Sequence, residues 1–428
     1  MSSTKSTTTP APAPQPARAP AAAWRMLALG VAAQAAGTFL VSTPAYLIPF
    51  LHVQQGMPLA EAGLLAAAPT FGMVLTLVAW GALADRFGER WVIAGGLALT
   101  ALFALVAVPA AGWGYAALGI LLLLGGGASA SVNAASGRVV VGWFPRSRRG
   151  LAMGIRQMSQ PLGVAVAALV VPPLAEQHGI GAPLAAVAVA LAVLAVACAV
   201  GIADPPRPAK PGSPNAKTTP TSTSSSAPTP TATSTSPYRR SPFLLRIHLA
   251  SALLVVPQFT LSTFGLVWLI TALHWNPAAA GAVIALSQFV GAFGRIAVGH
   301  LSDRVDSRTR VMRWVAVSGV AVMLLLATTG LLEWSAAAAV MLVIATTVSV
   351  ADNGLAFTAV AEAAGPHWSG RALGVQNTGQ FVAASVVGPA IGALITVAGY
   401  PLAFALVALT PLASLALIPR HDEQPLEP

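Results

Sequence analysis

Ionisable and amide side chains stand inside long apolar stretches of this sequence. An arginine or aspartate at the centre of a membrane helix costs about 2.5 to 3.5 kcal/mol on insertion scales, so such residues are candidate functional groups. Arg156 lies roughly 10 Å into its apolar stretch, and Gln157 and Gln160 follow it. A guanidinium beside amides can bind a carboxylate through paired N–H bonds. The alternative is a structural ion pair with a buried acid such as Asp352.

Asp352 is the clearest acid within an apolar stretch, and Asn353 follows it. Burial favours the neutral form of a carboxyl group, which can then take up and release a proton. We therefore interpret Asp352 as a candidate proton-coupling residue. The alternative is a permanent ion pair with an arginine inside the membrane.

Other polar side chains have the spacing of one helical face. Gln34 and Thr38 are four residues apart, as are Gln258 and Ser262, so each pair shares a face. Such groups either line a cavity or form hydrogen bonds between helices. The predicted substrate-binding residues are Arg156, Gln157, Gln160, Asn133, Arg138, Gln34, Thr38, Tyr46, Gln258, Ser262, Asn353, Gln376, Asn377 and Gln380.

The sequence contains no motif of an enzyme. It has no Walker-type phosphate loop, no HExxH and no GxSxG, and its single cysteine, Cys198, rules out a CxxC site. We therefore expect no catalytic activity, no cofactor and no metal. Because the sequence has no ATP-binding motif, any movement of a solute by this protein would be driven by a concentration gradient across the membrane.

The composition predicts an all-α integral membrane protein. Hydrophobic residues make up 56% of the chain and charged residues 8%, whereas soluble domains carry about 25% charged residues. A length of 428 residues accommodates a dozen spans of roughly 20 residues. The predicted spans are 24–51, 58–80, 91–109, 115–141, 149–173, 180–202, 243–271, 277–299, 311–331, 335–360, 370–397 and 400–419.

The net charge of +10 comes from lysines and arginines that lie mainly between the apolar stretches. They fall in alternate connections, which predicts that both termini are cytoplasmic by the positive-inside rule. This distribution differs from the clustered basic face of a nucleic-acid binder. We expect a multi-pass protein of a bacterial cytoplasmic membrane. Its expected partners are the lipid bilayer, a small-molecule substrate and protons, and we expect a monomer that binds no nucleic acid.

The chain repeats itself. Asp303 lies 218 residues after Asp85 in a similar motif, and Asn353 lies 220 residues after Asn133. Near-constant offsets indicate two six-helix units in parallel orientation. The predicted organisation is a disordered tail over 1–23, a bundle over 24–203, a Pro-, Ser- and Thr-rich flexible linker over 204–242, a bundle over 243–419 and a tail over 420–428.

The sequence GALADRFGER over 81–90 resembles the loop signature of the major facilitator superfamily, and residues 299–308 form a degenerate copy. The resemblance implies 12 transmembrane helices in two pseudo-symmetric bundles, with loops that control alternating access. We expect Arg295 to support the second loop. The predicted gating residues are Gly81, Asp85, Arg86, Gly88, Arg90, Gly299, Asp303, Arg304 and Arg295.

These features predict a secondary transporter for a small organic anion, similar to a monocarboxylate, coupled to protons. One alternative is a drug or metabolite exporter working by proton antiport, which Asp352, Trp268 and the Gly388–Pro389 pair favour. A second is a transporter-like sensor that binds its ligand without moving it.

Overall fold

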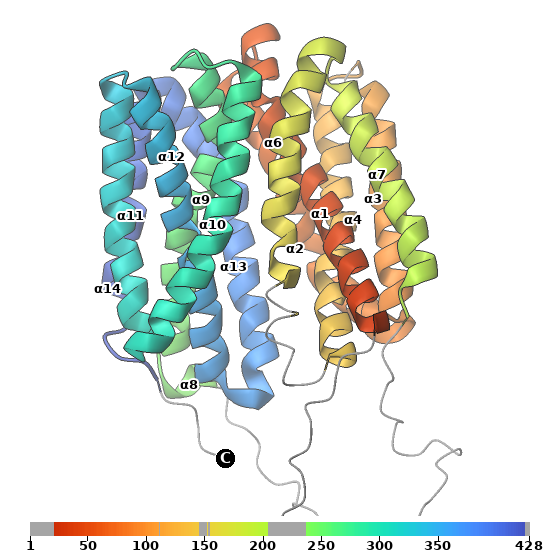
Figure 1. The fold of residues 1–428 in the computed structure, drawn as a ribbon, viewed down its shortest axis with the longest axis vertical. Helices are drawn as coiled ribbons and strands as arrows, with labels where there is room; N and C mark the ends of the chain where they lie inside the picture. The colour runs from red at the N-terminus through yellow and green to blue at the C-terminus, as the bar shows by residue number, and fades with distance from the viewer. Residues whose placement is uncertain (1–20, 111, 145–151, 153–154, 204–236, 424–428) are drawn as a thin grey trace, which may run out of the picture.

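The structure, a computed structural model, describes residues 21–110, 112–144, 152, 155–203 and 237–423. Within this part of the chain all regular elements are helices (Figure 1). The first half contains α1 (Ala21–Pro49), the π-helical turn η1 (Phe50–Gln54), α2 (Leu59–Phe87), α3 (Glu89–Ala110), α4 (Tyr115–Trp143), α6 (Ser159–His178) and α7 (Gly181–Gly201). The second half contains α8 (Pro237–Arg240), α9 (Phe243–Thr271), α10 (Pro277–Val305), α11 (Arg308–Leu331), α12 (Ser335–Ser349), α13 (Asp352–Val407) and α14 (Leu409–Leu417).

Among the described residues, 11 helical segments are long and apolar enough to cross a membrane. The last of them, Arg371–Leu417, has 47 residues and would be about 70 Å long if straight, more than twice the thickness of the hydrocarbon core. Gly399 interrupts it with a φ of 76°, which a right-handed helix cannot contain. The segment therefore makes two crossings, and the predicted fold of 12 membrane helices is confirmed.

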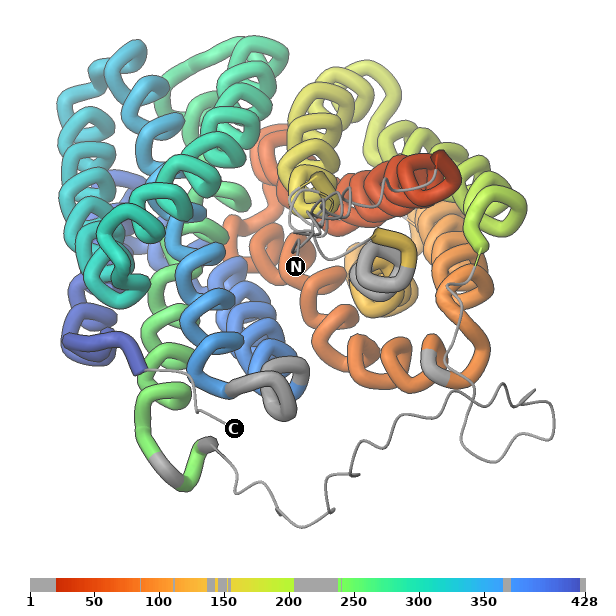
Figure 2. The backbone as a smooth tube through the Cα atoms, turned by 60° about the horizontal axis from the view of Figure 1, so that its bottom comes forward, coloured from red at the N-terminus to blue at the C-terminus, as the bar shows by residue number. Residues whose placement is uncertain are grey.

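The duplication is visible in the backbone. Residues with positive φ end or connect corresponding helices in the two halves, at the same offsets of 218 and 220 residues that relate the sequence motifs. The pairs are Gly56 with His274, Gly88 with Asp306, and Gly179 with Gly399. Each half is therefore a copy of the same helical unit, and Figures 1 and 2 show the two halves side by side.

The two halves pack together through α2 against α13 and α6 against α10. Near the start of α2, a Cβ on Gly63 would overlap the carbonyl oxygen of Gly388, so only glycine allows this approach. In the same way, Gly281 of α10 contacts the backbone at Ala168 of α6. These contacts lie at one end of the bundle, which we call the far end. The linker leaves from the opposite end, which we call the linker end.

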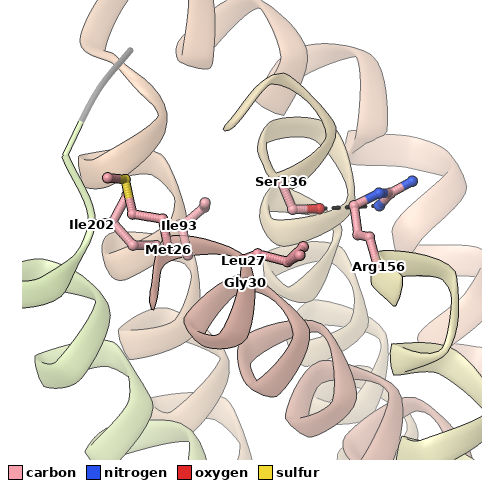
Figure 3. Close-up of a pocket in the computed structure, with 7 residues that line it drawn as sticks. All are labelled: Met26, Leu27, Gly30, Ile93, Ser136, Arg156 and Ile202. Atoms are coloured by element: carbon pink, nitrogen blue, oxygen red, sulfur yellow. Dashed lines mark hydrogen bonds between the residues drawn. The ribbon is translucent and has the colours of Figure 1, made fainter. Parts of the chain in front are cut away.

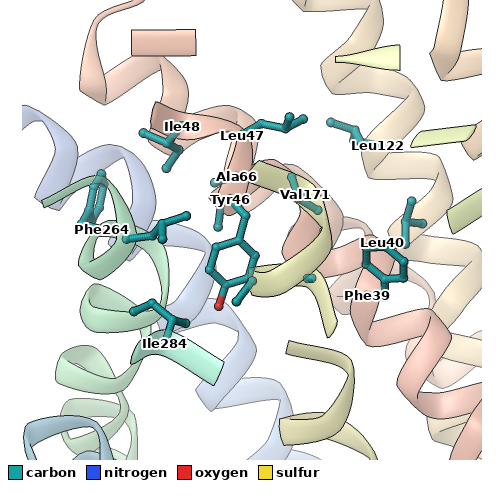
Figure 4. Close-up of a cluster of buried hydrophobic side chains, with 14 of the residues drawn as sticks. Phe39, Leu40, Tyr46, Leu47, Ile48, Ala66, Leu122, Val171, Phe264 and Ile284 are labelled. Carbon is teal, nitrogen blue, oxygen red and sulfur yellow. The ribbon is translucent and has the colours of Figure 1, made fainter. Parts of the chain in front are cut away.

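An apolar cluster fills the bundle at the far end (Figure 4). Tyr46 and Ile48 of α1 lie in it together with Phe264 of α9 and Ile284 of α10, and all four side chains are buried. The cluster thus joins helices from both halves, and it closes the space between them on this side.

The predicted tenth span, 335–360, is broken. Helix α12 ends at Ser349 and α13 begins at Asp352, with Ala351 N donating to the Val348 carbonyl. Ser349 Oγ donates to the carbonyl of Thr346, a back-bond of the kind that bends helices. The break puts Asp352 at the start of a helix within the membrane.

Candidate functional site

In the first half, Arg156 extends from a helical turn just before α6 towards α4. Its Nη1 donates to Ser136 Oγ over 3.1 Å, and its main-chain carbonyl accepts a bond from Ser159 Oγ (Figure 3). The side chain is half-buried. It borders a small cavity of about 10 Å³, which is otherwise lined by Ser136 and by Met26, Leu27, Gly30, Ile93 and Ile202. The cation is thus positioned between α1, α4 and α6.

Three predicted amides surround this region on the same helices. Gln34 of α1, Asn133 of α4 and Gln160 of α6 form no side-chain hydrogen bond within the described part of the chain, and the Oε1 of Gln34 is buried. The neighbouring Thr38 hydroxyl donates to the Gln34 carbonyl over 2.9 Å. Gln157 is exposed. Within the described residues, the amides of Gln34, Asn133 and Gln160 therefore do not hold these helices together.

The second half brings its predicted amides into one connected network. Asn353 Nδ2 donates to Gln258 Oε1 over 2.9 Å, and Gln380 Nε2 donates to Asn353 Oδ1 over 3.0 Å. Gln380 Nε2 also donates to Ser251 Oγ over 2.7 Å. Since 27 residues of straight helix would separate Asn353 from Gln380 by about 40 Å, the contact also shows that α13 folds back on itself.

A second polar contact group lies nearer the linker end of α9. His248 Nδ1 is 2.5 Å from Gln376 Oε1, and its Nε2 is 2.9 Å from the Tyr238 hydroxyl of α8. Of the remaining predicted residues here, Ser262 donates to the Phe259 carbonyl, and Asn377 is half-buried without a side-chain hydrogen bond in the described part of the chain.

Four of these polar residues were missed by the sequence reasoning. His248 carried a usable signal, because it is an ionisable residue inside a predicted span. Ser136 and Ser251 carried almost none, since small hydroxyl residues are common in membrane helices. Tyr238 falls within the predicted flexible linker, but residues 237–240 form the helical turn α8. The tail 1–20, the linker residues 204–236 and the end 424–428 lie outside the described residues.

Asp352 is 1% exposed and its Oδ2 has no hydrogen-bond partner among the described residues. It borders a second small cavity of about 10 Å³ inside the second half, formed by residues of α9, α11, α12 and α14 that are all apolar except Ser349. Its pseudo-equivalent residue in α4, 220 positions earlier, is the fully buried Val132. The carboxyl group therefore points into the bundle, where a valine stands in the other half.

Arg295 of α10 is the charged residue that interacts electrostatically with Asp352. No ion pair between Arg156 and Asp352 is present in the described part of the chain, where Arg295 is the cation that acts on the acid. Support of the second loop by Arg295 stays a prediction, and its charge also acts on Asp352.

The predicted gating loops differ in how their charges are used. In the second loop, Arg308 donates to Asp303 and its Nη2 lies 3.4 Å from Glu362 Oε1, which connects α10, α11 and α13. Arg304 is exposed. A Cβ on Gly299 would meet no atom within 4 Å.

In the first loop, Arg90 Nε donates to the Ala199 carbonyl of α7 over 2.6 Å, and its guanidinium lies over the Trp91 ring. Arg86 is exposed and lies over Phe87. Gly88 ends α2 with a φ of 93°, while Gly81 leaves open space where a side chain would stand. The side chains of Asp85 and Arg138 lie outside the described part of the structure.

A duplicated twelve-helix bundle with ionisable groups between its helices defines the class of multi-pass membrane transporters. The chain belongs to the Major Facilitator Superfamily, whose sequence profile matches residues 27–387.

Two curated relatives bear on the family. A Mycobacterium tuberculosis protein named uncharacterized MFS-type transporter Rv2994 is 45% identical over 400 residues, which cover 93% of this chain and 85% of the relative. An Arabidopsis thaliana protein named probable anion transporter 4, chloroplastic, is 30% identical over 158 residues, which cover 37% of this chain and 29% of the relative.

Solved structures agree with the fold. A bacterial homolog of the human lysosomal transporter Spinster, in an inward-facing and unoccupied conformation, superposes with a TM-score of 0.70 at 15% identity and covers 93% of this chain and 95% of its own. The same comparison with the inward-facing and occupied conformation gives a TM-score of 0.68. At this identity the likeness concerns the fold alone.

Proposed function

We propose that the protein is a secondary active carrier that moves a small organic anion, of the size of a monocarboxylate, together with protons. The observation that carries the proposal is Arg156, a half-buried guanidinium at the described start of the fifth membrane span. Its planar fork matches the two oxygens of a carboxylate, and in a low-dielectric site such charge-assisted bonds are strong. The printed name of the Arabidopsis relative, a probable anion transporter, supports the same class of substrate.

Alternating access between the two halves is supported by how they meet. Their closest backbone contacts, Gly63 with Gly388 and Gly281 with Ala168, all lie at the far end. Interfaces made of small residues can separate and re-form as rigid bodies. In this proposal the far end faces outwards, and the linker end faces the cytoplasm.

The distribution of basic residues supports this orientation in the cytoplasmic membrane. Arg246 of α9 and Arg313 of α11 donate to main-chain carbonyls at the end of α14, and Arg308 begins α11 at the same end of the bundle. Positive charge on this side favours a cytoplasmic location.

Asp352 is the proposed proton carrier. Its carboxyl group is buried, its Oδ2 accepts no bond within the described residues, and Arg295 is the nearby charge. A group in such a place changes its protonation state when the local field changes, and a movement of α10 against α13 would change that field.

Two of the features that favour an exporter have packing roles. Trp268 is buried and meets the Phe404 ring edge-on at 5.1 Å, and Gly388 is part of the contact with α2. These two residues therefore provide no separate argument for a drug-binding cavity, and Asp352 serves proton coupling in either direction of transport.

The test is uptake of radiolabelled L-lactate by the purified protein in liposomes under an inward proton gradient. Arg156→Lys keeps the charge but loses the planar fork, so uptake should fall by more than about tenfold, and Arg156→Gln should be worse. Arg246→Gln is the matched control, because its guanidinium binds main-chain carbonyls at the end of α14. Normal uptake by a well-folded Arg156→Gln protein would overturn the proposal.

A further inference from the structure

The two halves use equivalent amides in opposite ways. Asn353 and Gln380 of the second half donate hydrogen bonds to neighbouring side chains, whereas Asn133 and Gln160 of the first half, each 220 residues earlier, form none in the described part of the chain. Gln160 is half-exposed, while Gln380 is 8% exposed. The backbones at these paired positions are equivalent, so the difference between the halves lies in the hydrogen bonds and the exposure of the side chains.

The two halves also differ in charge at a third pair of equivalent positions. Arg156 of the first half corresponds to Gln376 of the second, again 220 residues apart. Gln376 is 1% exposed and its Oε1 contacts His248, so it belongs to the packed interior of the second half. The first half thus combines a cation with amides that have no side-chain hydrogen bond among the described residues, and the second half contains neutral amides that bind one another.

We propose that the first half binds the substrate, with Asn133 and Gln160 as its polar contacts beside Arg156, and that Asn353 and Gln380 form a structural brace between α9 and α13. The charge of the ligand rests on the proposed function, but the division of roles between the halves does not. A polar side chain that is partly buried without a protein partner loses free energy unless a ligand or water bonds to it.

The spacing of these groups defines the chemical class of the ligand. Gln160 follows Arg156 by four residues across the turn at Met158, so their backbones are about 6 Å apart along the chain. An acid whose carboxylate is bound by Arg156 would then reach the amide with an oxygen on the next carbon. The class that fits is a short 2-hydroxy or 2-oxo carboxylic acid, because the amide of Gln160 can donate a hydrogen bond to the oxygen on carbon 2. A plain fatty acid has no oxygen at that carbon.

The experiment compares the matched variants Asn133→Ala with Asn353→Ala and Gln160→Ala with Gln380→Ala. The first measurement is thermal unfolding of the purified protein without ligand. Both second-half variants should lower the melting temperature by about 2 °C or more, because each leaves a bonded partner unsatisfied, and both first-half variants should change it little. Equal lowering in the two halves would overturn the division of roles.

The second measurement is competition of L-lactate with propionate, which has the same charge but no hydroxyl group. The unaltered protein should prefer lactate by at least about tenfold, since a site built to bond a hydroxyl group rejects its absence. Gln160→Ala should remove most of that preference, and Gln380→Ala should keep it. An unchanged preference in Gln160→Ala and Asn133→Ala would overturn the substrate contact.

The two measurements separate the two claims. If neither acid is carried, the ligand class and the anion proposal both fail, while the melting temperatures still decide whether the second-half amides are a brace. If lactate and propionate are carried equally well, transport of anions stands and the 2-oxygenated class is wrong.

Discussion

The Tyr238 hydroxyl and His248 Nε2 lie 2.9 Å apart, which connects the end of the inter-bundle segment to a histidine in the first turns of α9. The other ring nitrogen, Nδ1, faces Gln376 Oε1, a carbonyl oxygen that accepts a bond. The neutral ring therefore carries its proton on Nδ1, and Nε2 accepts from Tyr238. Burial raises the pKa of the Tyr238 hydroxyl, which keeps it protonated and able to donate.

We predict that Tyr238→Phe destabilises the protein by about 1 kcal/mol, the usual net contribution of a hydrogen bond. The effect should be present at pH 5 as well as at pH 8, because the hydroxyl donates to the neutral ring and accepts from the protonated one. Thermal unfolding at both pH values measures it. Tyr115→Phe is the control, since its hydroxyl bonds Gln55 in an exposed pair and its loss should have a smaller effect.

A second prediction concerns the start of α11. The Asp422 carboxylate accepts from Arg308 N over 3.1 Å and from Thr309 N over 2.8 Å, two donors that no helical carbonyl can satisfy. Asp422→Ala should therefore lower the free energy of unfolding by about 0.5 to 2 kcal/mol. Glu362→Ala removes the same charge from the contact with Arg308, but this pair is exposed and should be worth less than about 1 kcal/mol. Chemical denaturation of both variants compares them, and an equal effect would contradict the capping role.

Much of the fold was predictable because its causes are local. The lengths of the apolar stretches predicted the spans, and the positions of the arginines predicted which connections lie on the same side of the membrane. The offsets of 218 and 220 residues, seen in the sequence for Asp85 with Asp303 and for Asn133 with Asn353, recur in the backbone, where Gly179 and Gly399 have positive φ at equivalent turns. The break before Asp352 was not predictable from hydropathy, because Val350 and Ala351 are as apolar as the helices on either side.

The site was predictable in its residue types but not in its contacts. Asn353, Gln380 and Gln258 were identified as polar groups inside spans, and they lie together. Their equivalents in the first half were identified by the same rule, yet they do not bond one another. Whether an amide binds a neighbouring helix or remains available depends on distances between side chains that are far apart in the sequence, such as the 95 residues between Gln258 and Asn353.

The third prediction tests the closed far end. A Cβ on Gly63 would overlap the Gly388 carbonyl, so Gly63→Ala should separate the two halves there and favour the conformation that is open at the far end. Spin labels at the exposed positions Val53 and Leu332, in a Cys198→Ser background, would report a longer distance. Gly95→Ala is the control, because no atom lies within 4 Å of the added Cβ. An unchanged distance in Gly63→Ala would show that the contact does not determine the closed state.

The last prediction addresses Asp352 and separates proton coupling from a structural role. Asp352→Asn keeps the shape of the side chain but cannot gain or lose a proton, so proton-driven accumulation of the anion should stop while exchange of external for internal anion continues. A purely structural carboxylate predicts a different result. Its removal would leave Arg295 as an uncompensated cation in the membrane, folded yield would fall, and Arg295→Gln would restore it in the double variant. Measuring accumulation, exchange and folded yield for both single variants and the double variant distinguishes these cases. Full proton-driven accumulation by a well-folded Asp352→Asn protein would remove Asp352 from the coupling mechanism, and it would direct attention to His248, a buried histidine within a membrane span of the second half.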